Sequence, residues 1–301
     1  MKRFLNKKTL VTGGASGIGK AICQRLVEEG ADLVFIDRNI EAGKAFEQEL
    51  SNQESSSLFV AADLTNEDEV ERGFHETKKI LGHIDVLINN AGGAFGENYK
   101  ETTVENWNAD LALNLTSHYM LTRLVLPEMV ERGLGVVTNI SSVNGIQALG
   151  NPAYSAAKAG LISFTQTVAT EYGPKGIRCN VVLPGTVETP VWKHRVEARP
   201  DVFEKVKSWY PVGRVGRPED IAAAVAFLSA DEANLFCDKE TGEEILHMSD
   251  WQFNRLQAYS SGILYPTEST IDEDGENDEK DSDRIEEQDS ENQENKEQEK
   301  F

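Results

Sequence analysis

The stretch that decides the fold spans residues 12–19 and reads Thr12-Gly-Gly-Ala-Ser-Gly-Ile-Gly19. It follows the apolar run Thr9–Thr12, which predicts a buried strand, and it opens the amphipathic run Ile18–Glu29, which predicts a helix. Glycine suits a tight strand-to-helix turn because it has no Cβ to restrict the backbone or to keep other groups away. The first N–H groups of the helix are then free to bind phosphate groups. An ordinary glycine-rich turn is the alternative.

The same alternation of strand and helix continues to about residue 230. Further short runs rich in valine, isoleucine and leucine are Leu33–Asp37, Leu58–Ala62, Val86–Asn89, Val136–Ser141 and Cys179–Leu183. Helical patterns such as Glu41–Leu50 and Glu67–Ile80 lie between them. Continuous apolar strands that alternate with helices are typical of a parallel sheet covered on both faces. The chain is therefore predicted to be α/β, with a doubly wound Rossmann-type parallel sheet of six to seven strands.

The glycine turn and an acidic residue after it predict a dinucleotide site. The residues expected around the pyrophosphate are Gly13, Ser16, Gly17, Ile18 and Gly19. Asp37 ends the second predicted strand, and a carboxylate there accepts hydrogen bonds from ribose hydroxyls and repels a 2′-phosphate. NAD is therefore favoured, although Arg38 beside it could hold that phosphate, which keeps NADP open. A turn or helix-capping role for Asp37 is the alternative.

The composition is strongly acidic, with 51 Asp and Glu residues against 30 Lys and Arg and a formal net charge of −21. This balance excludes non-specific nucleic-acid binding, which requires excess positive charge. The three cysteines are widely spaced, which favours a reducing, cytoplasmic setting without disulfides. No spacing of histidine or cysteine suggests a metal, and His118 is expected on a helix surface. No apolar stretch approaches the roughly 20 residues that cross a bilayer, so no membrane span is expected.

The composition also divides the chain into three segments. Residues 1–235 are predicted to form the Rossmann-type domain. Residues 236–269 diverge from that pattern but contain aromatic residues, so they are expected to fold or dock. Residues 270–301 hold 15 Asp and Glu against 4 Lys and Arg and almost no apolar residues. Such a segment buries too little apolar surface to offset its ordering entropy, so we expect a disordered acidic tail.

Three motifs together resemble those of the short-chain dehydrogenase/reductase family. They are Thr12–Gly19, Asn89-Asn-Ala-Gly92 and Tyr154-Ser-Ala-Ala-Lys158, in the order and spacing of the family. The tyrosine–lysine motif alone would be common by chance, but the combination is specific and covers residues 5–230. The resemblance implies a nicotinamide-dependent oxidoreductase that transfers a hydride to or from a secondary alcohol or ketone.

The resemblance also implies site residues. Tyr154 would be the general acid/base and Lys158 would lower its pKa. Ser142 would hold the substrate oxygen, with Ser141 as the alternative, and Asn114 would support a proton relay. The cofactor contacts that it implies are Asp63, Leu64, Asn90, Ala91, Gly92, Pro184, Gly185, Val187 and Thr189, together with Tyr154 and Lys158.

Elementary chemistry agrees with the roles of Tyr154 and Lys158. They are four residues apart in the helical run Tyr154–Glu171, so they share one helix face. A lysine ammonium near a phenol favours the phenolate and lowers its pKa from about 10. A tyrosine tuned in this way can accept or return the proton of an alcohol. The alternative is an interface tyrosine beside a solvated lysine.

The chain departs from the family after residue 233. Glu244–Met248 could be the seventh strand, without the glycines that usually follow it, or the strand could be replaced by a helical tail. In the family this edge often builds the tetramer interface. A homo-oligomer, dimer or tetramer, is therefore compatible with the sequence, but its state is open.

The substrate is the least determined feature. Residues 193–217 hold 7 Lys and Arg against 3 Asp and Glu, which suggests an anionic substrate. A solvated charged lid explains the same residues. A 3-oxoacyl, sugar, polyol or steroid substrate cannot be separated by sequence. Two rival functions remain, namely a non-catalytic nucleotide-binding protein on this fold and an interaction protein that acts through the acidic tail.

Overall fold

The structure of the protein is a computed structural model. It describes residues 2–51, 56–147, 149–192, 196–197, 200–208 and 210–236. By its contacts the chain divides into Met1–Tyr265 and Pro266–Phe301, and every described residue belongs to the first unit. Of segment 236–269 only residue 236 is described. The possible seventh strand Glu244–Met248 and the acidic tail 270–301 lie outside the described residues, so those expectations stay predictions.

A sheet of six parallel strands forms the centre of the described part. The strands are β1 (Lys8–Thr12), β2 (Asp32–Asp37), β3 (Ser57–Ala61), β4 (Val86–Asn89), β5 (Gly135–Ile140) and β6 (Ile177–Val182). Their order is β3-β2-β1-β4-β5-β6, and Leu10 pairs with Val34 on one side and Leu87 on the other. The strand order reverses between β1 and β4, and ligands of such sheets bind at this point, beyond the strands' carboxyl ends.

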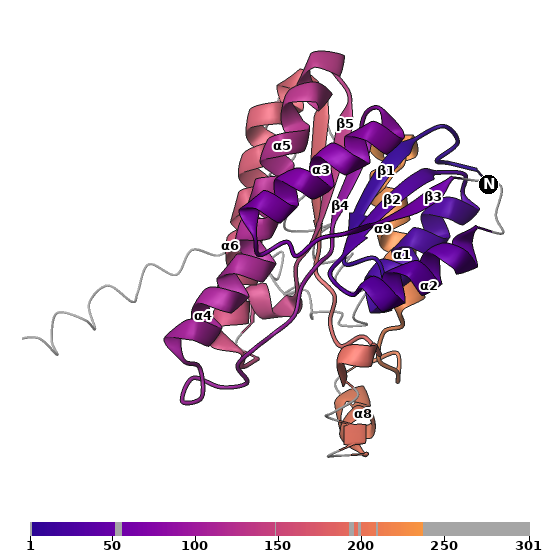
Figure 1. Ribbon diagram of the computed structural model, residues 1–301. Coiled ribbons are helices and arrows are strands. Elements are labelled where there is room, and N and C mark those ends of the chain that lie inside the picture. Colours follow the sequence, from indigo (N-terminus) through magenta and orange to yellow (C-terminus); the bar gives the residue numbers. More distant parts are fainter. Residues whose placement is uncertain are drawn as a thin grey trace, which may run out of the picture. The chain divides into compact units, whose positions relative to one another are not determined.

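Helices cover both faces of the sheet (Figure 1). One layer consists of α1 (Gly17–Glu28), α2 (Ile40–Leu50) and α9 (Pro218–Ser229), and the other of α3 (Glu67–Leu81), α5 (Ser117–Arg132) and α6 (Pro152–Tyr172). Each layer has its own apolar core. Phe35 of β2 and Phe46 of α2 lie 5.2 Å apart between ring centroids in the first core, and Leu87 and Met129 are fully buried in the second. The predicted α/β fold is confirmed.

A long helical segment on the second face was not predicted in this form. It begins as α4 (Val104–Leu111), passes through a π-helical turn, η1 (Ala112–Thr116), and continues as α5. A π turn inserts a residue into a helix and is frequent at functional sites. Here its only buried residue is Asn114.

Shorter elements complete the described chain. They are η2 (Val143–Gly145), η3 (Gly173–Lys175), η4 (Pro190–Trp192), α8 (Val202–Lys207) and η5 (Asp231–Phe236). Both η4 and α8 follow β6, so they lie beyond the carboxyl edge of the sheet, and α8 stands at the bottom of Figure 1.

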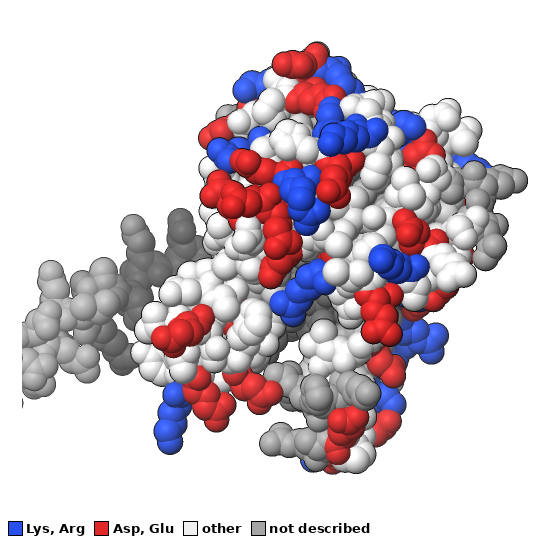
Figure 2. Space-filling view, in the orientation of Figure 1, with Lys and Arg blue, Asp and Glu red and all other residues white. Residues whose placement is uncertain are grey.

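Charges of both signs are interspersed on the face shown in Figure 2. On α3, Arg72 pairs with Glu69 at 3.5 Å and with Glu76 at 3.1 Å. Such exposed pairs add little stability. Because acidic side chains lie among the basic ones, this face has no broad basic field (Figure 2). No helix in the described ranges is long and apolar enough to cross a membrane.

Candidate active site

The glycine turn between β1 and α1 leaves the start of α1 open. Ser16 is the N-cap, but its side chain accepts no capping hydrogen bond, and the first turn carries no acidic residue. By contrast, side chains cap α2, α3 and α4 through Asn39, Asn66 and Thr103. The first N–H groups of α1 are therefore left for an anion.

Two glycines of this turn are required by its geometry. Gly17 has φ +52°, and a Cβ there would lie 3.4 Å from Thr189. A Cβ at Gly19 would lie 2.0 Å from the carbonyl oxygen of Gly13, which no side chain can tolerate. The turn consequently brings bare backbone to the carboxyl edge of the sheet, as binding of a pyrophosphate requires.

The ends of β1 and β4 are joined by side-chain hydrogen bonds. The hydroxyl of Thr12 accepts from the backbone N–H groups of Asn90 and Ala91 at 2.9 and 3.0 Å. The amide of Asn90 donates to the carbonyls of Thr12 and Gly13 at 2.9 and 3.2 Å. The motif Asn89–Gly92 thus lies against the glycine turn at the point where the strand order reverses.

Asp37 lies at the end of β2, where the sequence predicts it. Its carboxylate accepts hydrogen bonds from the backbone of Ala15 at 3.1 Å and of Asn39 at 2.9 Å. Asp37 therefore braces the glycine turn through Ala15 and the start of the next loop through Asn39. A carboxylate has further lone pairs, so this role is compatible with binding a ribose as well.

Asp63 and Leu64 follow β3 at the same edge. The hydroxyl and the backbone N–H of Thr65 donate to the Asp63 carboxylate at 2.8 and 2.9 Å. These bonds, with a smaller contribution from the charge of Arg38, hold the pKa of Asp63 below its usual value. Leu64 is buried in the second core.

Tyr154 and Lys158 occupy the first turns of α6 and share one face, as predicted. The ammonium of Lys158 lies 5.6 Å from the centroid of the Tyr154 ring and donates to the carbonyl of Ile140 at 2.7 Å. Lys158 is buried, and burial lowers its pKa to about 7. It is therefore a group that can exchange a proton near neutral pH.

The pKa of Tyr154 differs from the sequence-based expectation. Burial raises it, the hydrogen bond with Ser142 opposes that rise, and the charge of Asp110 adds to it. Lys158 was expected to lower this pKa. Its ammonium donates to the carbonyl of Ile140, and burial of the phenol outweighs the opposing effect of Ser142 on the pKa of Tyr154.

The structure separates the two adjacent serines. Ser142 lies near enough to Tyr154 to lower the pKa of its phenol, and its hydroxyl lies 3.3 Å from Oδ1 of Asn144. Ser141 is turned away, because its hydroxyl donates to the backbone carbonyl of Lys158 at 2.8 Å. Ser142 is therefore the serine that lies beside the tyrosine.

Asn114 lies in the π turn and is fully buried. Its amide donates to the carbonyl of Gly93 at 2.7 Å and accepts from the N–H of Gly93 at 3.1 Å. A Cβ added at Gly92 would meet Asn114 Oδ1 at 2.9 Å and Lys158 Nζ at 3.4 Å. Asn114 and Lys158 therefore border the same point beside Gly92.

The segment after β6 carries the remaining predicted cofactor residues, Pro184, Gly185, Val187 and Thr189. Thr189 lies over Gly17, and Val187 forms a bridge with Gly216. The hydroxyl of Tyr210 accepts from the backbone N–H of Thr186 at 2.7 Å, so this segment is tied to the chain after α8. Of residues 193–217, whose net positive charge suggested an anionic substrate, positions 193–195, 198–199 and 209 lie outside the described residues. Lys205, Lys207 and Arg214 form ion pairs with Asp201, Glu204 and Asp220.

The expectation for His118 was wrong. It is 1% exposed and faces the interior, where its Nδ1 lies 3.0 Å from the hydroxyl of Ser117. Burial and the nearby charge of Lys158 hold its pKa well below the usual value. The period of a helix places His118 one turn after Asn114 on the same face, which was the available signal for its burial.

Asp110 was missed altogether. It is 0% exposed and accepts a hydrogen bond from Asn114. Its spacing of four residues before Asn114 was the available signal. Among the described residues, no group of three or more His, Cys, Asp or Glu side chains is arranged to hold a metal.

Comparison with known proteins agrees with this geometry. The short chain dehydrogenase family matches residues 7–200. An uncharacterized oxidoreductase of Schizosaccharomyces pombe is 44% identical over 228 residues, which is 75% of this chain and 84% of that protein. An acetoacetyl-CoA reductase of Allochromatium vinosum is 39% identical over 227 residues, covering 74% of this chain and 91% of that protein.

Solved structures show the same relation. A short chain dehydrogenase/reductase family oxidoreductase from Burkholderia thailandensis is 43% identical, with a TM-score of 0.71, covering 76% of this chain and 87% of that one. The chain belongs to the short-chain dehydrogenase/reductase family. It is an oxidoreductase that acts on CH–OH or carbonyl groups with a nicotinamide cofactor, NAD or NADP.

Proposed function

We propose that the protein transfers a hydride between NAD and a secondary alcohol or ketone, with Tyr154 as the general acid/base. The observation that carries this proposal is the cluster at the carboxyl edge of the sheet. Ser142 lies close enough to Tyr154 to lower the pKa of its phenol, and the buried Lys158 lies 5.6 Å from the centroid of the same ring. Asn114 and Lys158 border the same point beside Gly92.

The residues present fit a dinucleotide. The open N-terminus of α1 offers N–H groups to a pyrophosphate. The Asn90 amide donates to the carbonyl of Thr12 beside the glycine turn, and Thr189 lies next to Gly17. The cofactor contacts proposed are those that the sequence predicts, from Gly13 to Thr189. When bound, a nicotinamide group accepts or supplies the hydride.

The chain's own residues handle the proton. In oxidation, the phenolate of Tyr154 accepts the hydroxyl proton as the hydride leaves the carbon, and in reduction the phenol of Tyr154 returns that proton to the oxygen. Ser142 donates to the substrate oxygen and stabilises the charge that develops there. Lys158, with a pKa of about 7, can pass the proton onward, and Asn114 orders the polar groups beside it.

Asp37 favours NAD over NADP. The 2′-phosphate of NADP would lie beside the Asp37 carboxylate and be repelled by it. Arg38 is the cation that could offset this repulsion. The relatives named above do not resolve the substrate. A 3-oxoacyl thioester is one class to test because the Allochromatium vinosum relative is named an acetoacetyl-CoA reductase.

Cofactor binding can be tested by titrating the full chain with NADH and NADPH and following nicotinamide fluorescence. NADH should bind at least about 10-fold more tightly, and Asp37→Asn should weaken it by about 10-fold, or about 1.4 kcal/mol. Asp32→Asn, at the opposite end of β2, is the matched control and should leave binding unchanged. Equal binding of both nucleotides would overturn the preference for NAD.

Turnover should then be sought with secondary alcohols and NAD, and with ketones and 3-oxoacyl thioesters and NADH. Activity that is lost in Tyr154→Phe supports the proposal. Tight nucleotide binding without turnover of any of these compounds would favour a nucleotide-binding protein instead.

A further inference from the structure

Three polar residues form a buried stripe on the long helical segment of the second face. Asp110, Asn114 and His118 are four residues apart, and their exposed fractions are 0%, 0% and 1%. The stripe begins on α4, which packs against α6, the helix that carries Tyr154 and Lys158. The charge of Asp110 acts on the pKa of Tyr154, and the charge of Lys158 acts on that of His118. Burying a carboxyl group without a cation is costly, so the burial of Asp110 calls for a reason.

The contacts of Asp110 reach two parts of the site. One oxygen accepts from the Asn114 amide at 3.3 Å, and the other accepts from the backbone N–H of Phe95 at 3.4 Å. The backbone carbonyl of Asp110 accepts from the same amide at 2.9 Å. Both carboxyl oxygens act as acceptors, which is what an ionised carboxylate provides.

We propose that Asp110 is a positioning residue of this active site, whose carboxylate holds Asn114 and the Phe95 loop and whose negative charge sets how readily Tyr154 releases its proton. The inference rests on the proposed role of Tyr154. Asp110 joins Tyr154, Lys158, Ser142 and Asn114 as a fifth residue of the site. Asp110 itself touches none of the reacting atoms. Burial also raises the pKa of Asp110 itself, and the Phe95 N–H opposes that rise.

Tyr154 is the titratable group on which the charge of Asp110 acts. Helix α4 packs against α6, which carries Tyr154 and, one turn later, Lys158. On α4 itself Glu105 is exposed, and in the preceding loop Glu97, Lys100 and Glu101 are exposed. No Lys, Arg or His side chain forms an ion pair with Asp110 within the described part of the chain, so its charge is not neutralised by a partner there.

The test follows the ionisation of Tyr154 directly and needs no substrate. Tyrosines of the full chain are labelled with carbon-13 at the ring carbon that bears the hydroxyl, and the resonance absent from Tyr154→Phe is assigned to Tyr154. A pH titration by NMR is then compared between the wild type and Asp110→Asn. The Asn variant should titrate at lower pH by several tenths of a unit, because a nearby negative charge opposes the phenolate.

Glu105→Gln removes one negative charge from the same helix, but from its exposed face, and should leave the Tyr154 titration unchanged. If Asp110→Asn does not fold, Asp110→Ser removes the same charge and replaces it in the comparison. An unchanged titration midpoint of Tyr154 in the folded variant would overturn the inference. The proposed function fails separately, if Tyr154→Phe keeps full turnover.

Discussion

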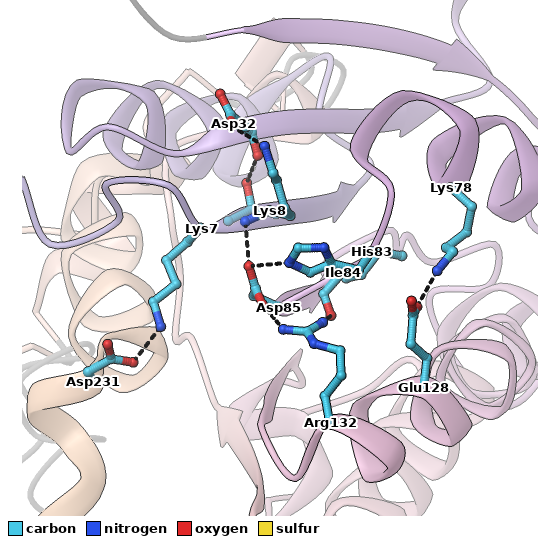
Figure 3. A network of polar contacts seen from close by, with 11 residues as sticks. Lys7, Lys8, Asp32, Lys78, His83, Ile84, Asp85, Glu128, Arg132 and Asp231 are labelled. Atoms are coloured by element: carbon cyan, nitrogen blue, oxygen red, sulfur yellow. Dashed lines mark hydrogen bonds and ion pairs between the residues drawn. The ribbon is translucent and has the colours of Figure 1, made fainter.

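A buried carboxylate lies at each end of the parallel sheet, and the two differ in how well their charge is compensated. At the amino edge, Asp85 is 6% exposed and lies at the centre of the network in Figure 3. It accepts from the Lys8 backbone N–H at 2.8 Å and from Arg132, and His83 lies 3.3 Å away. At the carboxyl edge, Asp110 is 0% exposed, and among the described residues its carboxylate receives only the two long hydrogen bonds from Asn114 and Phe95.

Their pKa values diverge accordingly. Burial alone would raise the pKa of Asp85, but the Lys8 N–H and the Arg132 guanidinium outweigh it and hold that pKa below its usual value. Burial prevails at Asp110 and raises its pKa. The amino edge is therefore built for stability, and the carboxyl edge retains poorly compensated groups, as active sites do.

The largest expected effect is on turnover at the carboxyl edge. Tyr154→Phe should lower kcat/KM by about 1,000-fold, because the phenylalanine cannot exchange the substrate proton. The measurement is initial rates with a substrate found in the screen. Tyr119→Phe, at a half-exposed position of α5, is the matched control and should retain wild-type rates. Comparable losses in both variants would contradict the role of Tyr154.

The next effect is on stability at the amino edge. Asp85→Ala should lower the free energy of unfolding by about 3 kcal/mol, because it leaves Arg132 and the Lys8 N–H without their partner. Denaturant unfolding measures this change. Asp68→Ala, at an exposed position of α3, should change stability by less than about 0.5 kcal/mol. Equal losses of stability in the two variants would show that the network in Figure 3 does not stabilise the fold.

A pair of glycines at opposite edges separates backbone strain from function. Gly17 has φ +52° in the glycine turn, and Gly133 has φ +63° after α5 with nothing within 4 Å of an added Cβ. Alanine at either position should destabilise the fold by about 1 kcal/mol. Only Gly17→Ala should weaken NADH binding as well, which fluorescence titration can measure. If Gly133→Ala also bound NADH more weakly, the weaker binding of Gly17→Ala would be explained by its lower stability alone.

The smallest effect is the pH dependence of stability. The stabilisation from Asp85 is present above its usual pKa of 3.8 and is lost as pH falls through its lowered folded value. For Asp110 the sign is reversed, so wild-type stability falls as pH rises from 3.8 through its raised folded value. In thermal unfolding across this pH range, the stability of Asp85→Asn relative to the wild type should fall as pH rises. The stability of Asp110→Asn relative to the wild type should rise. Parallel curves for both variants would refute the comparison.

Much of the site could be predicted because its residues lie close together in sequence or at the ends of strands. Tyr154 and Lys158 are one helical turn apart, so helix geometry alone places them on one face. The glycine turn follows from the residues on either side of it. Asp37 was placed correctly at the end of β2, but its bonds to Ala15 and Asn39 depend on how that strand end meets the turn.

The sequence by itself determined the parallel sheet, the glycine turn and the tyrosine–lysine pair, because strand and helix periods are local properties. Only the tertiary structure decided that Ser142, not Ser141, meets Tyr154, that His118 and Asp110 are buried, and that burial raises the pKa of Tyr154. The physical reason is that burial and charge depend on segments distant in sequence. Contacts such as the packing of α4 against α6 are not contained in any local sequence pattern.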